Sequence, residues 1–124
     1  MAFKIDEKGN ITIRQGDSGR VVIEGLNTDQ NYTVYFAIQD ENRRPVGNEI
    51  SVMSNMQYTV VFELTSLLTD LLKVAEDEET HTYYYGVKTC TVDGFEDTLS
   101  IGGSDIGNKN TITVYPKKVE GVNI

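Results

Sequence analysis

The sequence predicts an all-β protein: an antiparallel β-sandwich of two sheets, with one short crossover helix at about residues 66–75. Seven to nine short runs alternate apolar and polar side chains, which is the period of a strand with one buried face. Turn-forming residues separate these runs at near-regular spacing. Only one stretch changes to the spacing of an amphipathic helix. Together these three observations favour a two-sheet sandwich.

The length of the chain fits one such domain. At 124 residues it buries enough surface for a core without disulfides or a structural metal. We expect the sandwich to occupy residues 1–116 and to end at Pro116. Residues 117–124 are expected to form a tail that is flexible or docks on a neighbour.

The first two strands are expected at residues 11–13 and 21–23, on either side of the run QGDSGR. A tight connection needs glycine where φ is positive, and short polar side chains that bond to nearby main-chain amides. The run offers both, at Gly16, Asp17, Ser18 and Gly19. We therefore expect a structural turn here, with both glycines at positive φ.

Three strands are expected in the middle of the chain. Residues 32–39 place Tyr32, Val34, Phe36 and Ile38 on one face. A charged turn over residues 40–48 leads to a weaker strand at residues 49–53. Residues 56–64 keep strict alternation, which makes them the clearest strand in the chain.

A helix is expected after these strands, with Thr65 or Ser66 as its N-cap. Five apolar side chains then recur at helical spacing. They are Leu67, Leu68, Leu71, Leu72 and Ala75. This spacing puts them on one side of a helix at about residues 66–75.

A hairpin and a last strand complete the expected sandwich. Residues 81–92 form a second long strand, which Asp93-Gly94 joins to residues 95–101. Asp-Gly between alternating runs is a strong hairpin signal, because a type I′ turn needs positive φ at both central residues. A loop over residues 102–110 leads to a strand that ends at Pro116.

The tyrosines after the helix favour a sandwich of immunoglobulin-like type. In such folds a tyrosine near the start of the penultimate core strand hydrogen-bonds back to the preceding crossover. Tyr83, Tyr84 and Tyr85 stand at the corresponding place.

Charge and composition argue against several classes of function. The chain has 19 acidic and 11 basic residues, so a nucleic acid or an anionic membrane would be repelled overall. No secretion signal or membrane span is expected, because no apolar run is long enough. Cys90 is a single cysteine, and the acidic run 76–79 lacks the spacing of a calcium loop. We expect neither a metal nor a cofactor.

Gly-Asp-Ser-Gly also surrounds the nucleophilic serine of chymotrypsin-like proteases. Ser18 would need a base within hydrogen-bond reach and donors for an oxyanion, and His81 is the only imidazole in the chain. The run continues with Arg20-Val21 and not with the Gly-Pro of those enzymes. We therefore expect no catalytic residue, and hydrolysis by Ser18 is the least favoured hypothesis.

Two tyrosines are candidates for an interface. Tyr35 and Tyr84 lie on the strand faces opposite the expected core, and tyrosine is enriched at protein interfaces. Covering the outer face of a sheet explains them equally well. A carbohydrate- or cell-surface-binding sandwich is an alternative, which three aromatic side chains along one shallow groove would favour.

A family resemblance rests on two features: the run Gln15, Gly16, Asp17, Ser18 that closes the first strand, and the short helix, Leu67 to Val74, before the tyrosine strand. In these features the chain resembles small immunoglobulin-like domains of tailed phages and prophages of Gram-positive bacteria, notably the N-terminal domain of baseplate upper proteins. The resemblance covers residues 11 to about 101. It implies a virion component of the tail or baseplate, assembled in the bacterial cytoplasm without catalysis.

The favoured hypothesis is thus a non-enzymatic structural module that binds other virion proteins or a second copy of itself. An unpaired strand edge is an expected contact, because it templates pairing with another chain. The start of the tail is another, at Lys117, Lys118 and Val119.

Overall fold

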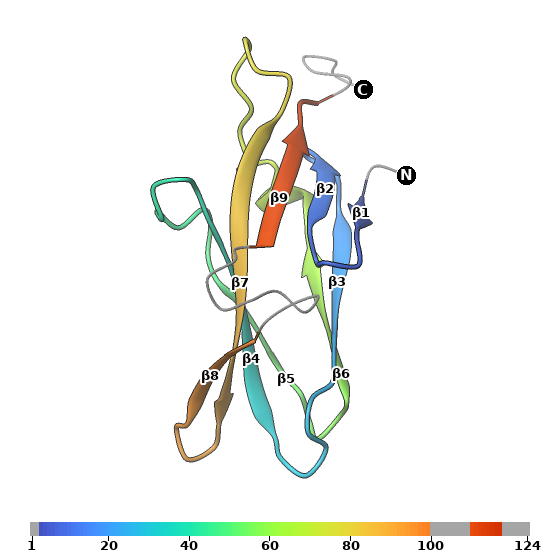
Figure 1. The fold of residues 1–124 in the computed structure, drawn as a ribbon, viewed down its shortest axis with the longest axis vertical. Helices are drawn as coiled ribbons and strands as arrows, with labels where there is room; N and C mark the ends of the chain where they lie inside the picture. The colour runs from blue at the N-terminus through green and yellow to red at the C-terminus, as the bar shows by residue number, and fades with distance from the viewer. Residues whose placement is uncertain (1–2, 100–109, 118–124) are drawn as a thin grey trace.

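The computed structural model describes residues 3–99 and 110–117. Within these residues the protein is all-β, as expected, with a single short helix (Figure 1). The elements follow in the order β1 (Lys4–Ile5), β2 (Ile11–Arg14), β3 (Gly19–Glu24), β4 (Tyr32–Gln39), β5 (Ile50–Met53), β6 (Thr59–Leu64), α1 (Ser66–Thr69), β7 (His81–Thr91), β8 (Glu96–Leu99) and β9 (Asn110–Tyr115).

A large sheet contains seven strands in the order β1-β2-β9-β7-β4-β5, with β8 also paired to β7. The long strand β7 organises this sheet. Along one edge it pairs with β4, from Tyr84 opposite Gln39 to Thr91 opposite Tyr32. Along the other edge it pairs with β9 at residues 81–85 and with β8 at residues 87–90.

One strand pair contradicts the antiparallel expectation. β2 runs parallel to β9, in a register that sets Ile11 beside Ile112 and Arg14 beside Tyr115. β2 does not pair with β3, because the chain crosses between the two sheets through residues 15–18. The large sheet is therefore mixed. Alternation sets the faces of a strand but not its neighbours, so it could not predict this long-range pairing.

The second sheet consists of β3 and β6, paired antiparallel. Its inner face carries five buried side chains: Val21, Ile23, Val60, Phe62 and Leu64. They pack against the inner face of the large sheet, where Phe62 meets Phe36 with ring centroids 5.5 Å apart. The two sheets enclose one apolar core, so the molecule is sandwich-like.

The helix is shorter than expected. α1 covers only Ser66–Thr69, capped by the Thr65 hydroxyl, which accepts from the Leu68 amide at 3.2 Å. The Gln15 side chain donates to the Asp70 carbonyl at 2.9 Å, which takes up the oxygen that a continuing helix would use. The leucines also do not share one buried face. Leu72 is buried, whereas Leu67 is 83% exposed.

The hairpin between β7 and β8 is present, but its turn type is not the expected one. Only Gly94 has a positive φ, of 88°, and Asp93 does not. The Gly94 amide donates to the Thr91 carbonyl, and the Thr91 amide donates to the Phe95 carbonyl. This is a three-residue connection that ends in a left-handed glycine. Residues 100–109, which include the expected loop, lie outside the described residues.

Two consecutive residues at positive φ occur instead between β5 and β6. Asn55 has φ 53° and Met56 has φ 61°, and the Gln57 amide closes the turn on the Ser54 carbonyl at 3.0 Å. This is the backbone of a type I′ turn. β6 consequently begins at Thr59, and the expectation of a strand from Met56 is wrong.

Candidate functional site

The QGDSGR run forms the crossover between the two sheets. Gly16 has φ 87°, but Gly19 does not have a positive φ and is the first residue of β3. The second glycine has another use: an added Cβ at Gly19 would lie 2.2 Å from Cδ2 of Phe3. The expectation of positive φ at Gly19 is therefore wrong, and the close approach of the Phe3 ring explains the glycine.

Main-chain atoms and neighbouring side chains hold this crossover. The Asp17 amide donates to the Arg14 carbonyl at 3.0 Å, and the Asp17 carbonyl accepts from the Thr69 hydroxyl at 2.7 Å. Among the described residues, the side chains of Asp17 and Ser18 are exposed and make no hydrogen bond. Their expected bonds to nearby amides are absent because the main chain of Asp17 fills that role.

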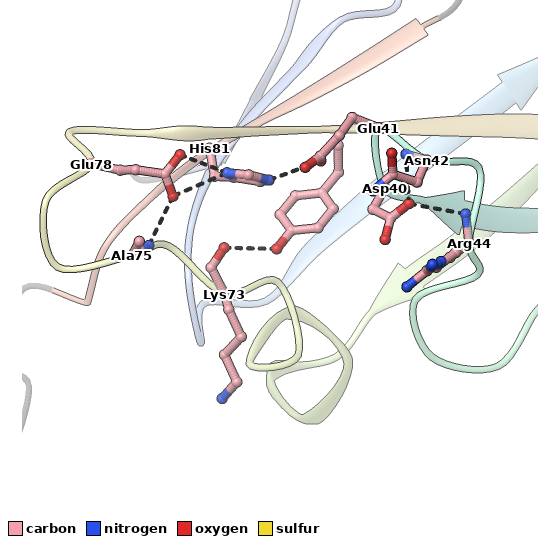
Figure 2. A network of polar contacts seen from close by, with 9 residues as sticks. Asp40, Glu41, Asn42, Arg44, Lys73, Ala75, Glu78 and His81 are labelled. Atoms are coloured by element: carbon pink, nitrogen blue, oxygen red, sulfur yellow. Dashed lines mark hydrogen bonds and ion pairs between the residues drawn. The ribbon is translucent and has the colours of Figure 1, made fainter.

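The structure does not bring Ser18 and His81 together. Both ring nitrogens of His81 contact carboxylates instead, with Nδ1 2.8 Å from Glu78 Oε2 and Nε2 3.1 Å from Glu41 Oε2 (Figure 2). Both nitrogens can donate a hydrogen bond at the same time only when the imidazole is protonated. His81 thus links the loop after β4 to the loop before β7.

Electrostatics support this protonated form. The pKa of His81 is raised, and the hydrogen bond to Glu78 is the largest cause. Burial of the imidazole lowers this pKa, and the hydrogen bond to Glu41 raises it further. The hydrogen bond from His81 in turn lowers the pKa of Glu78. The i, i+3 spacing of Glu78 and His81 was a signal for the first contact. Glu41 lies 40 residues away in sequence, and no local pattern indicates it.

A groove of about 640 Å³ lies on the outer face of the large sheet. Ala37 and Gly86 face each other across β4 and β7 and form its floor, and a Cβ added to Gly86 would meet no atom within 4 Å. Tyr35 and Tyr84 also line the groove, and both are half-buried. The two candidate interface tyrosines therefore belong to one surface.

The register fixes the shape of this groove. Tyr35 lies opposite Lys88 on one side of the small-residue floor, and Tyr84 lies opposite Gln39 on the other. The two tyrosines are thus four residues apart along the sheet, roughly 13 Å. Sequence reasoning missed Ala37 and Gly86, although a glycine inside a strand pattern signals a close approach by another group.

Among the residues that the structure describes, two outward-facing aromatic side chains line the groove. Tyr85 contributes to the lining, but it is buried and its ring stacks on Phe36 at a centroid distance of 5.0 Å. Its hydroxyl donates to the Gly9 carbonyl, and burial raises its pKa to about 12. In the described part of the chain, this groove therefore presents two exposed aromatic side chains and not the three that would favour sugar binding.

The tail begins with an ion pair. Lys117 Nζ lies 2.5 Å from Asp70 Oδ1, which attaches the chain after β9 to the end of α1. This contact lowers the pKa of Asp70. Lys118 and Val119 lie outside the described residues.

Within residues 3–99 and 110–117, no group of three His, Cys, Asp or Glu side chains is placed to hold a metal ion. No helix in the same residues is long and apolar enough to cross a membrane. The fold and the groove thus define an all-β, sandwich-like protein with one hollowed sheet face. No protein-family model and no curated protein matches the chain.

Proposed function

We propose that the protein is a non-enzymatic assembly module with an immunoglobulin-like arrangement of strands, which associates with a second copy through the groove. The order β9-β7-β4-β5 corresponds to strands G, F, C and C′ of that fold, and the pair β3-β6 corresponds to B and E. β2, which lies beside β9, is the strand that departs from the expected sandwich.

A tyrosine contact supports the immunoglobulin-like assignment. Tyr83 lies near the start of β7, directly after the crossover that contains α1. Its hydroxyl donates to the Lys73 carbonyl at 2.7 Å (Figure 2). A tyrosine at the start of strand F makes this type of contact in immunoglobulin domains.

The observation that carries the assembly proposal is the placement of Tyr35 and Tyr84 at the two sides of a floor made by Ala37 and Gly86. A tyrosine from another molecule fits such a hollow, because it brings a large contact area with few rotatable bonds. This face therefore both exposes tyrosine side chains and has a hollow in which a tyrosine of another molecule fits. Self-complementarity of this kind is what a two-fold symmetric contact requires.

The charges around the groove also favour a second copy of the chain as the partner. Lys88 is one lining residue, and Glu49 and Glu96 are two others, so the face carries both signs. Lys88 pairs with Glu96 of its own chain at 2.6 Å, and a two-fold axis through the groove lets it also approach a carboxylate of the partner protomer. Such pairs set the orientation of a contact more than its strength.

The biological setting we propose is a phage or prophage virion, in the tail or baseplate. The resemblance of the QGDS run and of the segment from α1 to the tyrosines of β7 supports this setting. A two-fold contact closes at a dimer, so a ring or fibre built from such dimers uses a further surface as well.

Sedimentation velocity over a range of concentrations tests the self-association. We expect the weight-average mass to rise above that of the monomer, and Tyr35→Ser to return it to the monomer value. Tyr58→Ser is the matched control, because Tyr58 is an exposed tyrosine (56%) outside the groove. A wild-type protein that stays monomeric at every concentration would contradict the proposal.

A further inference from the structure

A second surface is formed by three connections that meet at one end of the sandwich, at the lower end of Figure 1. We call it the loop end and define it as residues 24–31, 53–58 and 91–97. Strand register brings these segments together, because Tyr32 pairs with Thr91, Thr33 with Met53, and Glu24 with Thr59. The groove lies on the outer face of the large sheet and shares Glu96 with the loop end.

The loop end exposes large apolar side chains. They are Met53 (52%), Met56 (52%), Tyr58 (56%), Val92 (88%) and Phe95 (69%). Three of them belong to residues 53–58 and two to residues 91–97, so two of the three connections expose apolar surface, which marks interaction sites. Of these five, Phe95 also lines a pocket of about 290 Å³, together with Leu26, Tyr32 and Asp97.

The turn that presents Met56 is held in place against the neighbouring connection. The Ser54 amide donates to the Tyr32 carbonyl at 2.8 Å, and the Ser54 hydroxyl accepts from the Tyr32 amide at 2.9 Å. The Asn55 amide donates to Oδ1 of Asn31 at 2.9 Å. These bonds keep Met56 at a positive φ, which a non-glycine residue rarely adopts. The Met56 side chain is about half exposed. Because the turn is already ordered, it loses less conformational entropy when a partner binds.

Charge identifies the kind of partner. The three segments contain five carboxylates, Glu24, Asp29, Asp93, Glu96 and Asp97, and no Lys or Arg. Among the described residues only Glu96 of these is in an ion pair, with Lys88 at 2.6 Å. Two loop ends would therefore repel each other, unlike two grooves. A contact surface whose charges are all negative is complementary to a partner surface with positive charge.

We propose that the loop end binds a different protein, through a segment that presents a large apolar side chain flanked by Lys or Arg. The apolar side chain enters the pocket between Leu26 and Phe95, and the basic side chains approach Asp93 and Asp97. The pocket that takes the apolar side chain has none of the groove residues in its lining, and the two contacts share Glu96 alone among the residues named for them. The module would then bind a second copy of itself through the groove and a different protein through the loop end.

The test uses the full chain, isotope-labelled for NMR, and two peptides as probes. The first, Lys-Leu-Lys-Phe-Lys-Leu-Lys amide, carries both features of the proposed partner. The second, Lys-Ser-Lys-Ser-Lys-Ser-Lys amide, carries only the charge. We expect the first peptide to shift the amides of the loop end and to bind about tenfold more tightly than the second.

Two variants and an internal control make the result specific. Phe95→Ser and Met56→Gly should each weaken binding of the first peptide several-fold. Met56→Gly should also keep the fold, because glycine accepts the positive φ. Leu67→Ser removes an apolar side chain outside the loop end that is more exposed (83%) than either of these and should have no effect.

Acidic residues 76–79 lie in another loop and report on charge alone. Shifts centred there, equal affinity for the two peptides, or no shifts at all would overturn the proposal. A protein that is monomeric yet binds the first peptide at the loop end would remove the self-association and leave this surface standing.

Discussion

The hydroxyl of Tyr83 donates a hydrogen bond to the carbonyl oxygen of Lys73 across 2.7 Å and fastens the α1 crossover to the start of β7. Tyr83 is 6% exposed, so loss of the hydroxyl leaves that carbonyl without its partner in a largely buried place. We expect Tyr83→Phe to lower the free energy of unfolding by about 1 kcal/mol in urea denaturation. Tyr35→Phe is the control, since the Tyr35 hydroxyl makes no hydrogen bond among the described residues. Equal effects of the two variants would contradict a specific role for this bond.

The contact of His81 with two carboxylates predicts a dependence of stability on pH. The pKa of His81 is raised above its ordinary value of 6.5 in the folded protein. The stabilisation is therefore fully present below pH 6.5 and is lost as the pH rises through the raised pKa. We expect the urea midpoint to fall over that interval, and His81→Gln to flatten the fall. An identical pH profile in the two proteins would rule out the imidazolium contact.

Glu78 adds an effect on the acidic side. Its pKa is lowered below the ordinary value of 4.5, chiefly by His81 and then by the Ala75 amide. Its contribution is present above pH 4.5 and is lost as the pH falls through the lowered pKa. Glu78→Gln should therefore remove part of the stability change below pH 4.5, measured by urea denaturation. Glu79→Gln, one residue further along the same loop, is the control.

The two glycines of QGDSGR should respond differently to substitution. Gly16→Ala places a side chain at φ 87° and should cost about 1 kcal/mol of stability. Gly19→Ala should cost a similar amount, because the new methyl group displaces the Phe3 ring. Phe3→Ala should remove most of the cost at Gly19 and none at Gly16, in a double-mutant cycle by urea denaturation. Additive effects at Gly19 would refute the close approach of Phe3.

Ser18→Ala should change stability by less than about 0.5 kcal/mol, because its side chain is exposed and makes no hydrogen bond among the described residues. The same variant tests the hydrolase hypothesis. A serine-reactive fluorophosphonate probe should not label the wild-type protein. Labelling that disappears in Ser18→Ala would show that Ser18 is a nucleophile.

The sequence was informative wherever a feature depends on neighbouring residues. Alternation placed Val34, Phe36 and Ile38 in the core and Tyr35 on the outer face, because the side-chain period of a strand is two. It also indicated the hairpin at Gly94. Turn chemistry was less reliable: Asn55 and Met56 adopt positive φ where no glycine signals it, since contacts with Asn31 and Tyr32 hold that turn.

Features that join distant residues could not be predicted. The parallel pair of β2 and β9 depends on a crossover between sheets, and the second contact of His81 depends on a loop 40 residues earlier. The contact at the end of the helix, between Gln15 and Asp70, joins residues 55 positions apart. The groove needed the register of β4 with β7, which alone sets Ala37 opposite Gly86.

Sedimentation equilibrium of Gly86→Thr beside the wild-type protein tests the central claim most directly. A Cβ at this position meets open space, and threonine suits a strand better than glycine, so the variant should be at least as stable as the wild type. Its side chain nevertheless fills the floor of the groove. We predict a mass that rises with concentration for the wild type and a monomer for Gly86→Thr. Self-association of equal strength in both proteins would contradict the groove as the assembly surface.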